Sequence, residues 1–335
     1  MARALQAALK SAKAEVTLAS RFQSRDRDGD AVTQNRLFEQ AKAEIERVTS
    51  QGRAAGWDVW ITYHNYYKAP DLLGPYVAEA LRIPYILVEA TRAKKRLSGP
   101  WARFAAAAEA ATDAAAAVLY MTQHDAEALH KYRYADQIIA HLPPFLATDV
   151  LPPESTREGS MLSVGMMRTG DKLSSFRLIA ETLSKLETRD WNLLIAGDGP
   201  TRRDVEEFMA PFANRVTLLG RLGPDELLRA YAESSIFFWP GINEAFGIAY
   251  LEAQASGLAV VAQDRPGVRD VLAPGAAYPP PEAGAGALAA RLDMLLSMPK
   301  LNKHIGQAAR RHVSRTHLLS PASARLSAVL SDVVP

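Results

Sequence analysis

The sequence has no cysteine among its 335 residues. That absence excludes a disulfide framework, thiolate metal sites and a cysteine nucleophile, and it fits a reducing cytoplasm. A surplus of either charge is also missing, because 39 Lys and Arg residues are balanced by 37 Asp and Glu residues. The net charge of +2 offers no dense cationic face of the kind that nucleic acids require, so we expect no nucleic acid partner.

Long hydrophobic runs are missing too. The most apolar stretch, Trp101–Met121, is interrupted by Arg103, Glu109 and Asp113 and cannot sit in hydrocarbon. Residues 1–16 carry charges throughout and lack the apolar run of a signal peptide. Hydrophobic residues still make up 48% of the chain, which is typical of a folded protein. We therefore expect a folded cytoplasmic protein that is peripheral to a membrane at most.

The chain shows short apolar, β-rich runs that alternate with longer helical patterns. This alternation is typical of parallel strands joined by crossover helices, and the length favours two α/β domains. Prolines at 143, 144, 152 and 153 indicate an interdomain linker, because proline neither donates to a sheet nor continues a helix. We predict an N-terminal domain over 1–146, a linker over 147–157, a C-terminal domain over 158–315 and a final helix over 316–335 that packs back on the N-terminal domain.

The start of the chain departs from the usual order. A doubly wound domain opens with a strand and a glycine-rich turn, whereas residues 2–14 have a helical pattern. Either the chain begins at an internal methionine or the N-terminal sheet lacks its first strand, and both explanations stay open. Strands are expected at 16–20, 59–63, 85–89, 117–122 and 137–140 in the first half, and at 161–164, 192–196, 216–219, 236–239 and 258–262 in the second.

The most informative segment is PGINEAFGIAYLEAQASG, residues 240–257. Gly247 lets the backbone approach a ligand closely, and a helix is predicted from about residue 246 to 256. The free amides of Phe246, Gly247 and Ile248 then point from a helix N-terminus, where the helix dipole favours a phosphate. We expect a diphosphate to bind there.

Within this segment EAFGIAYLE resembles the signature of retaining glycosyltransferases of family 4, in which two glutamates flank seven residues. The likeness extends upstream to LLIAGDGP and downstream to GLAVVAQDRPGVRDV, and it covers roughly residues 160–315. It implies a GT-B fold of two facing Rossmann-like domains. It also implies a nucleotide-diphosphate sugar as donor and transfer to an acceptor hydroxyl with retention of configuration.

The resemblance assigns roles to the two glutamates. In that family the first contacts the transferred sugar and the second holds the ribose of the donor, which by motif position are Glu244 and Glu252. Taken singly, Glu252 reads as a solvated helix residue and Glu244 as a carboxylate favoured by a helix start. The strand, proline, glycine and helix in the expected order favour the functional interpretation of both.

A departing diphosphate needs countercharge, and no Asp-rich metal motif is evident, so we expect neither metal nor cofactor. Arg168 and Lys172, in VGMMRTGDKLSSF, are the candidate cations; the alternative is that both are ordinary solvated charges. Met166 and Met167 intervene between glycine and arginine, which alters the family's loop. Leu222 lies where the family's backbone reads the nucleotide base.

In the N-terminal half His64 closes a predicted strand and so lies at the edge that faces a crevice. A structural histidine bonded to a carbonyl is the equal alternative. After the strand at 84–89 the family often places a histidine near the transferred sugar, but here the sequence is ILVEATRAKKR. Glu89 or Thr91 would take its place, or the sugar is positioned differently.

A basic run with Trp101 close behind it is the candidate contact for an anionic acceptor or a membrane surface. Four such charges in a loop are more often simply solvated. The run consists of Arg92, Lys94, Lys95 and Arg96.

These observations predict a glycosyltransferase that moves a sugar from a nucleotide-diphosphate sugar to a saccharide, lipid-linked or small-molecule acceptor. One alternative is a binding protein that keeps the donor site but has lost transfer, which the altered N-terminal features favour. The other is a nucleotide-sugar epimerase, against which the paired glutamates argue.

Overall fold

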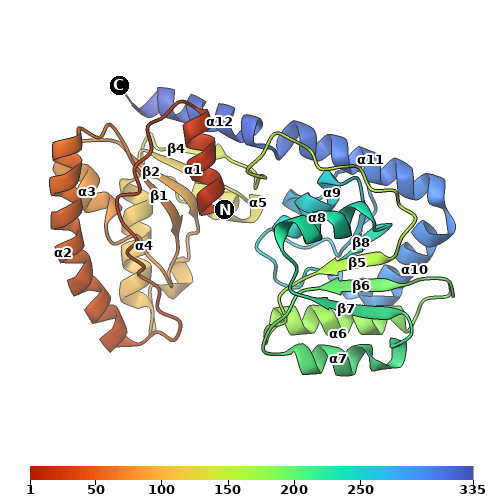
Figure 1. The fold of residues 1–335 in the computed structure, drawn as a ribbon. Helices are drawn as coiled ribbons and strands as arrows, with labels where there is room; N and C mark the ends of the chain where they lie inside the picture. Colours follow the sequence, from red (N-terminus) through yellow and green to blue (C-terminus); the bar gives the residue numbers. More distant parts are fainter. Residues whose placement is uncertain (335) are drawn as a thin grey trace. The chain divides into compact units, whose positions relative to one another are not determined.

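A computed structural model describes residues 1–334. The chain divides into two compact units, and the linker prolines Pro143 and Pro144 lie at the first division. The first unit comprises Met1–Pro143 together with the residues from Ala322 onward, and the second comprises Pro144–Pro321. Each unit is a parallel sheet with helices (Figure 1).

The first unit has a four-stranded parallel sheet in the order β1-β2-β3-β4. Leu87 and Val118, on the two central strands, are completely buried, as expected of a parallel sheet covered on both faces. The strands are β1 (Trp60–Asn65), β2 (Tyr85–Ala90), β3 (Ala117–Tyr120) and β4 (Ile138–His141). The helices are α1 (Ala2–Ser11), α2 (Ala31–Ala55), α3 (Gly74–Leu81), η1 (Lys94–Arg96), α4 (Ala102–Ala114) and α5 (Gln123–Lys131).

The strand expected at 16–20 was wrong, because this segment is irregular chain. The carbonyl of Ala19 accepts a 2.8 Å hydrogen bond from Arg47 Nη2, and the hydroxyl of Ser20 donates to the carboxylate of Glu44. Its polar groups are therefore bonded to side chains of α2 and not to a neighbouring strand. The other nine expected strands are confirmed, with ends that differ by at most two residues.

The second unit has a five-stranded parallel sheet in the order β7-β6-β5-β8-β9. Its strands are β5 (Met161–Val164), β6 (Leu193–Ala196), β7 (Val216–Gly220), β8 (Ile236–Phe238) and β9 (Ala259–Val261). The chain moves outward from β5 through β6 to β7 and then crosses back to β8, so the strand order reverses between β5 and β8. In open α/β sheets ligands bind beyond the carboxyl ends of the strands at such a reversal.

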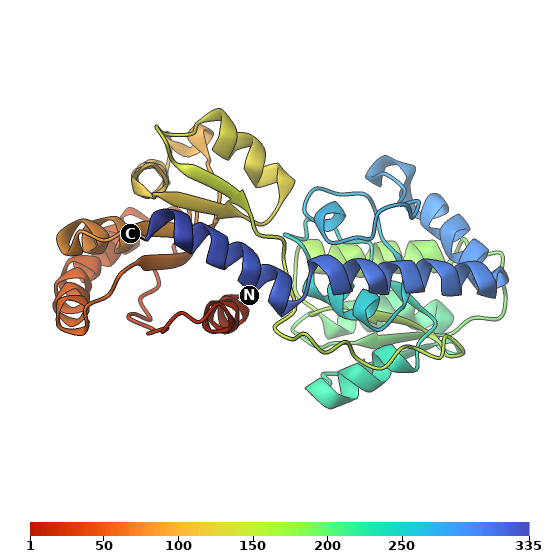
Figure 2. The ribbon, with the colours of Figure 1, turned by 90° about the horizontal axis from the view of Figure 1, so that it is seen from above.

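Helices cover both faces of this second sheet. Figure 1 shows α6 and α7 on one side and α9 on the other, as right-handed crossovers require. In Figure 2, α11 lies along the second unit, where it packs against α9 and β9. The helices are α6 (Asp171–Leu183), α7 (Arg202–Met209), η2 (Ala210–Phe212), α8 (Pro224–Ala232), α9 (Ile248–Ala255), η3 (Val268–Asp270), η4 (Pro281–Ala283), α10 (Gly284–Ser297) and α11 (Pro299–Thr316). The last helix, α12 (Leu319–Val333), begins in this unit and from Ala322 onward belongs to the first.

Candidate functional site

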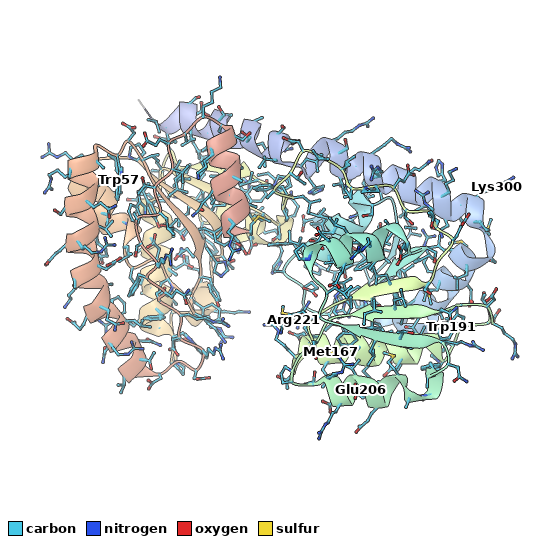
Figure 3. All side chains as sticks on the ribbon, in the orientation of Figure 1. Trp57, Met167, Trp191, Glu206, Arg221 and Lys300 are labelled. Atoms are coloured by element: carbon cyan, nitrogen blue, oxygen red, sulfur yellow. The ribbon has the colours of Figure 1, made fainter. Side chains whose placement is uncertain are left out.

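The candidate site lies at the carboxyl edge of the second sheet. Figure 3 shows Met167 and Arg221, which follow β5 and β7, at one end of these strands and Trp191, which precedes β6, at the other. The loops after β5, β7 and β8 therefore meet at the edge where Met167 and Arg221 lie. These loops and the helices α6 and α9 that follow two of them carry the residues that the sequence nominated for the donor.

Lys172 and Glu244 form a direct ion pair between Nζ and Oε1. Lys172 lies in the first turn of α6 and Glu244 in the loop after β8, so the fold brings together two nominated residues that are 72 positions apart. Their side chains are only 21% and 13% exposed. The pair joins a cation and a carboxylate at the strand reversal, where a ligand can compete for either one.

Trp239 supports this pair and was not nominated from the sequence. Its indole Nε1 donates a 2.9 Å hydrogen bond to Glu244 Oε1, and Lys172 Nζ lies 5.1 Å from the centroid of its ring. The ring is buried against Phe176, and a Cβ at Gly165 would lie 2.6 Å from it, so glycine leaves the room that the indole occupies. A tryptophan directly before the proline of the motif loop was the signal that could have revealed it.

The loop between β8 and α9 is tied to the first turns of α6. Asn243 Nδ2 donates to Asp171 Oδ1 at 3.0 Å, and the amide of Ile242 donates to Ser175 Oγ at 3.2 Å. These bonds hold the two residues that directly precede Glu244. The carboxylate therefore meets Lys172 through a positioned loop.

Helix α9 begins at Ile248, two residues later than the sequence indicated, because Gly247 adopts a left-handed φ of 70°. A Cβ on Gly247 would lie 2.7 Å from the ring of Tyr250, so only glycine fits. The first amides of α9 have no preceding turn to bond, which leaves them available to an anion.

Glu252 is largely buried in α9, which rules out the solvated alternative. Tyr231 donates a 3.0 Å hydrogen bond to Glu252 Oε2. Burial raises the pKa of the Glu252 carboxyl, while the Tyr231 hydrogen bond opposes that shift. Burial and the Glu252 charge hold the pKa of Tyr231 well above its ordinary value, so Tyr231 stays a donor.

Arg168 and Leu222 lie at the same edge but are held less firmly. Arg168 is exposed, and it forms no ion pair within the described residues 1–334. Leu222 is half-buried just beyond β7.

The altered loop after β5 is braced by the turn at 197–200, since the Met167 amide donates to the Asp198 carbonyl at 3.0 Å. A Cβ on Gly199 would lie 2.2 Å from the Met167 carbonyl, which explains why this turn needs glycine.

In the first unit the structure brings His64 and Glu89 together. They are the next-to-last residues of the adjacent strands β1 and β2, and His64 Nδ1 lies 3.3 Å from Glu89 Oε1. Thr91 instead donates a 2.8 Å hydrogen bond to Asp125 Oδ1 at the start of α5.

The assignment of Arg92 to an exposed basic run was wrong. Its side chain is 1% exposed and pairs with Glu109 at 2.7 Å and Asp113 at 2.6 Å. Both carboxylates come from α4 and neutralise the guanidinium inside the unit. Lys94 also pairs with Glu109, at 3.2 Å.

Residues 1–334 lack two kinds of feature. No group of three or more His, Cys, Asp or Glu side chains in this part of the chain is arranged to hold a metal ion. None of its helices is both long and apolar enough to cross a membrane.

The second unit matches a known family. Residues 155–312 fit the family described as glycosyl transferases group 1. Over 98 residues the chain is 35% identical to sulfoquinovosyl transferase SQD2 of Arabidopsis thaliana, a match that covers 29% of this chain and only 18% of that protein.

Solved structures resemble the whole chain. Sucrose-phosphate synthase of Thermosynechococcus elongatus aligns with a TM-score of 0.72 at 16% identity, covering 99% of this chain and 92% of the other. HepE of Anabaena, in complex with UDP and glucose, aligns with a TM-score of 0.67 at 15% identity, covering 87% and 82%. At such identities the likeness shows the fold, and it confirms the expected GT-B type α/β architecture.

Proposed function

Because residues 155–312 match the family of group 1 glycosyl transferases, we propose that the protein moves a sugar from a nucleotide-diphosphate sugar to an acceptor hydroxyl with retention of configuration. The observation that carries this proposal is the Lys172–Glu244 pair beside the start of α9. It puts a cation, a carboxylate and free helix amides at one strand reversal, which is the set that a sugar diphosphate requires.

The leaving diphosphate is held by cations and amides. Its oxygens compete with Glu244 for Lys172, Arg168 adds a second positive charge from the loop after β5, and the amides around Gly247 bind a phosphate. Glu244, released from Lys172, then contacts the transferred sugar. Glu252 binds the ribose hydroxyls, and the backbone at Leu222 reads the base.

Transfer breaks the bond between the anomeric carbon and the phosphate oxygen and forms a bond to the acceptor oxygen on the same face. The proton of the acceptor hydroxyl passes to the departing phosphate oxygen, so atoms and charge balance without a protein base. In this scheme the two cations supply the countercharge, and no metal or cofactor takes part. The absence of cysteine supports a cytoplasmic setting.

The test is calorimetric titration of the protein with UDP, GDP and ADP. UDP comes first because the similar HepE structure contains UDP and glucose. We expect one nucleotide to bind tightly and Glu252→Ala to weaken it, while Glu207→Ala, an exposed change on α7, leaves affinity unchanged. Failure of all three nucleotides to bind contradicts the donor assignment.

One rival function has a specific observation in its favour. The segment that follows β2 has no histidine where the resembling family often has one, which favours a nucleotide-sugar binding protein that has lost transfer. Release of sugar from a bound nucleotide sugar into water separates the two. Slow hydrolysis supports the transferase, and tight binding without any hydrolysis or transfer supports the rival.

A further inference from the structure

His64 and Glu89 form an unusual pair at the carboxyl edge of the first sheet. Both are non-glycine residues with positive φ, 73° and 61°, at the ends of adjacent parallel strands. Such backbone conformations cost energy and persist where a side chain must be aimed at a ligand. The Tyr63 side chain also interacts with the Glu89 carboxylate, whereas Glu89 Oε2 is buried without a close hydrogen-bond partner and can accept a bond from a hydroxyl.

A row of aromatic side chains begins at His64. The His64 and Tyr66 rings lie 4.7 Å apart between centroids, the Tyr66 and Tyr67 rings 5.7 Å, and the Tyr67 and Trp101 rings 5.8 Å. All of these side chains are partly exposed. We call Tyr66, Tyr67 and Trp101 the aromatic ledge. Its flat rings offer apolar surface to the C–H groups of a sugar or polyol.

Two cations stand at the far end of the ledge. Lys68 Nζ lies 4.8 Å from the centroid of the Trp101 ring, and Arg96 Cζ lies 5.0 Å from that of Tyr67. Within residues 1–334 neither makes an ion pair, and Lys68 bonds only a neutral carbonyl, that of Arg27 at 3.4 Å. Arg96 Nε is buried without a hydrogen-bond partner.

The neighbouring cations behave differently. Arg92 and Lys94 are neutralised by the carboxylates of α4, whereas Lys68 and Arg96 face rings that carry no full negative charge. A ring face attracts a cation but leaves its N–H donors short of acceptors. The surface thus presents two cations without ion-pair partners beside the aromatic ledge and the Glu89 carboxylate.

We propose that this surface binds a phosphorylated sugar or polyol, which on the function proposed above is the acceptor. The phosphate lies at Lys68 and Arg96, because arginine and lysine suit phosphate oxygens and because Glu89 repels an anion from the other end. The ring or carbon chain lies on the aromatic ledge. Hydroxyls reach Glu89 and His64, and the phosphate is either free or part of a lipid headgroup.

The test uses the full chain and glucose 6-phosphate, with glucose and inorganic phosphate as comparison ligands, in calorimetric titrations. We expect glucose 6-phosphate to bind more tightly than either comparison ligand. The double variant Lys68→Gln, Arg96→Gln should weaken it about tenfold or more, as the loss of charge-assisted hydrogen bonds requires. The matched control Lys95→Gln, an exposed cation of the same run, should leave binding unchanged.

A second variant tests the hydroxyl end. Glu89→Gln should remove most of the preference for glucose 6-phosphate over inorganic phosphate and leave inorganic phosphate binding as it was. Co-sedimentation with phosphatidylglycerol against phosphatidylcholine vesicles identifies the source of the phosphate. Binding to the first vesicle that depends on Lys68 and Arg96 assigns a lipid headgroup, and binding of glucose 6-phosphate alone assigns a free ester.

Nucleotide titration separates this proposal from the proposed function. If the double variant binds nucleotide like the unaltered protein but loses glucose 6-phosphate, the acceptor surface is established. If neither glucose 6-phosphate nor phosphatidylglycerol binds, or if Lys95→Gln weakens binding as much as the double variant does, the surface assignment is wrong, whatever the nucleotide result. If nucleotide alone fails to bind, the donor assignment fails and the phosphate surface stands.

Discussion

The indole Nε1 of Trp239 is hydrogen-bonded at 2.9 Å to Glu244 Oε1, the oxygen that also faces Lys172. A single carboxylate oxygen thus receives a neutral donor from the end of β8 and a cation from α6. When phosphate draws Lys172 away, the indole bond still fixes the carboxylate. Trp239 is therefore a positioning residue for Glu244.

Trp239→Phe keeps a ring beneath Lys172 and removes only the N–H donor. Loss of a hydrogen bond to a charged group costs about 1.5 to 3 kcal/mol, so we expect kcat to fall by about one to two orders of magnitude. The KM for the donor should change little, because the diphosphate contacts remain. Steady-state kinetics with varied donor measures both constants.

The matched control is Trp191→Phe, at the opposite edge of the same sheet. It should leave both constants unchanged. A uniform loss in kcat and donor affinity in Trp239→Phe would mean that the tryptophan merely supports the fold of the site.

Lys172→Gln removes the cation assigned to the diphosphate. We expect the affinity for a nucleoside diphosphate to fall by about tenfold or more, since a charge-assisted bond is lost, while affinity for the uncharged nucleoside stays the same. Lys185→Gln, an exposed lysine just beyond α6, is the control. Calorimetry with both ligands checks this, and equal weakening of the two would remove Lys172 from the phosphate site.

Most of the strands in the two sheets could be predicted from the sequence. Buried parallel strands appear in it as continuous apolar runs, separated by residues that interrupt a strand. The motif loop likewise led to Glu244, and the segment VGMMRTGDKLSSF led to Lys172. The segment at 16–20 misled because β-rich composition forms a strand only beside a partner strand, and here α2 side chains take its polar groups.

The remaining contacts depend on the directions in which side chains point, and the spacing of residues along the sequence does not encode these directions. Arg92 looked like part of an exposed run, yet Glu109 and Asp113, 17 and 21 positions away, enclose it. The Trp239 bond depends on how the loop after β8 turns back over α6. His64 and Glu89 meet because β1 and β2 are neighbours in register.

The buried position of Arg92 gives a stability prediction. Arg92→Met leaves Glu109, whose side chain is 8% exposed, with the partly exposed Lys94 as its remaining ion-pair partner and the Ala93 amide as a hydrogen-bond donor. Removing one member of a buried pair typically costs about 3 to 5 kcal/mol, and we expect a loss of that order in the free energy of unfolding. Denaturant titration measures it, with Lys95→Met as the exposed control. A loss no larger than that of the control would show that the buried pair adds nothing to stability.

Glu252 makes the stability of the second unit depend on pH. Burial raises its pKa above the ordinary 4.5, so the folded protein binds this proton more readily than the unfolded chain does. The contribution of Glu252 to stability is therefore full below about pH 4.5 and falls as pH rises through the folded pKa. Glu252→Gln removes this loss, because the amide is neutral at every pH and can still accept the Tyr231 hydrogen bond.

The difference in Tm between Glu252→Gln and the unaltered protein should therefore shift in favour of the variant as pH is raised from 4 toward 8. Glu207→Gln, an exposed change, should show a constant difference over the same range. The variant should at the same time lose nucleotide affinity, because the carboxylate that holds the ribose is gone. A Tm difference that does not change with pH would contradict the raised pKa of Glu252. Nucleotide affinity that stays intact in the variant would contradict the assignment of Glu252 to the ribose.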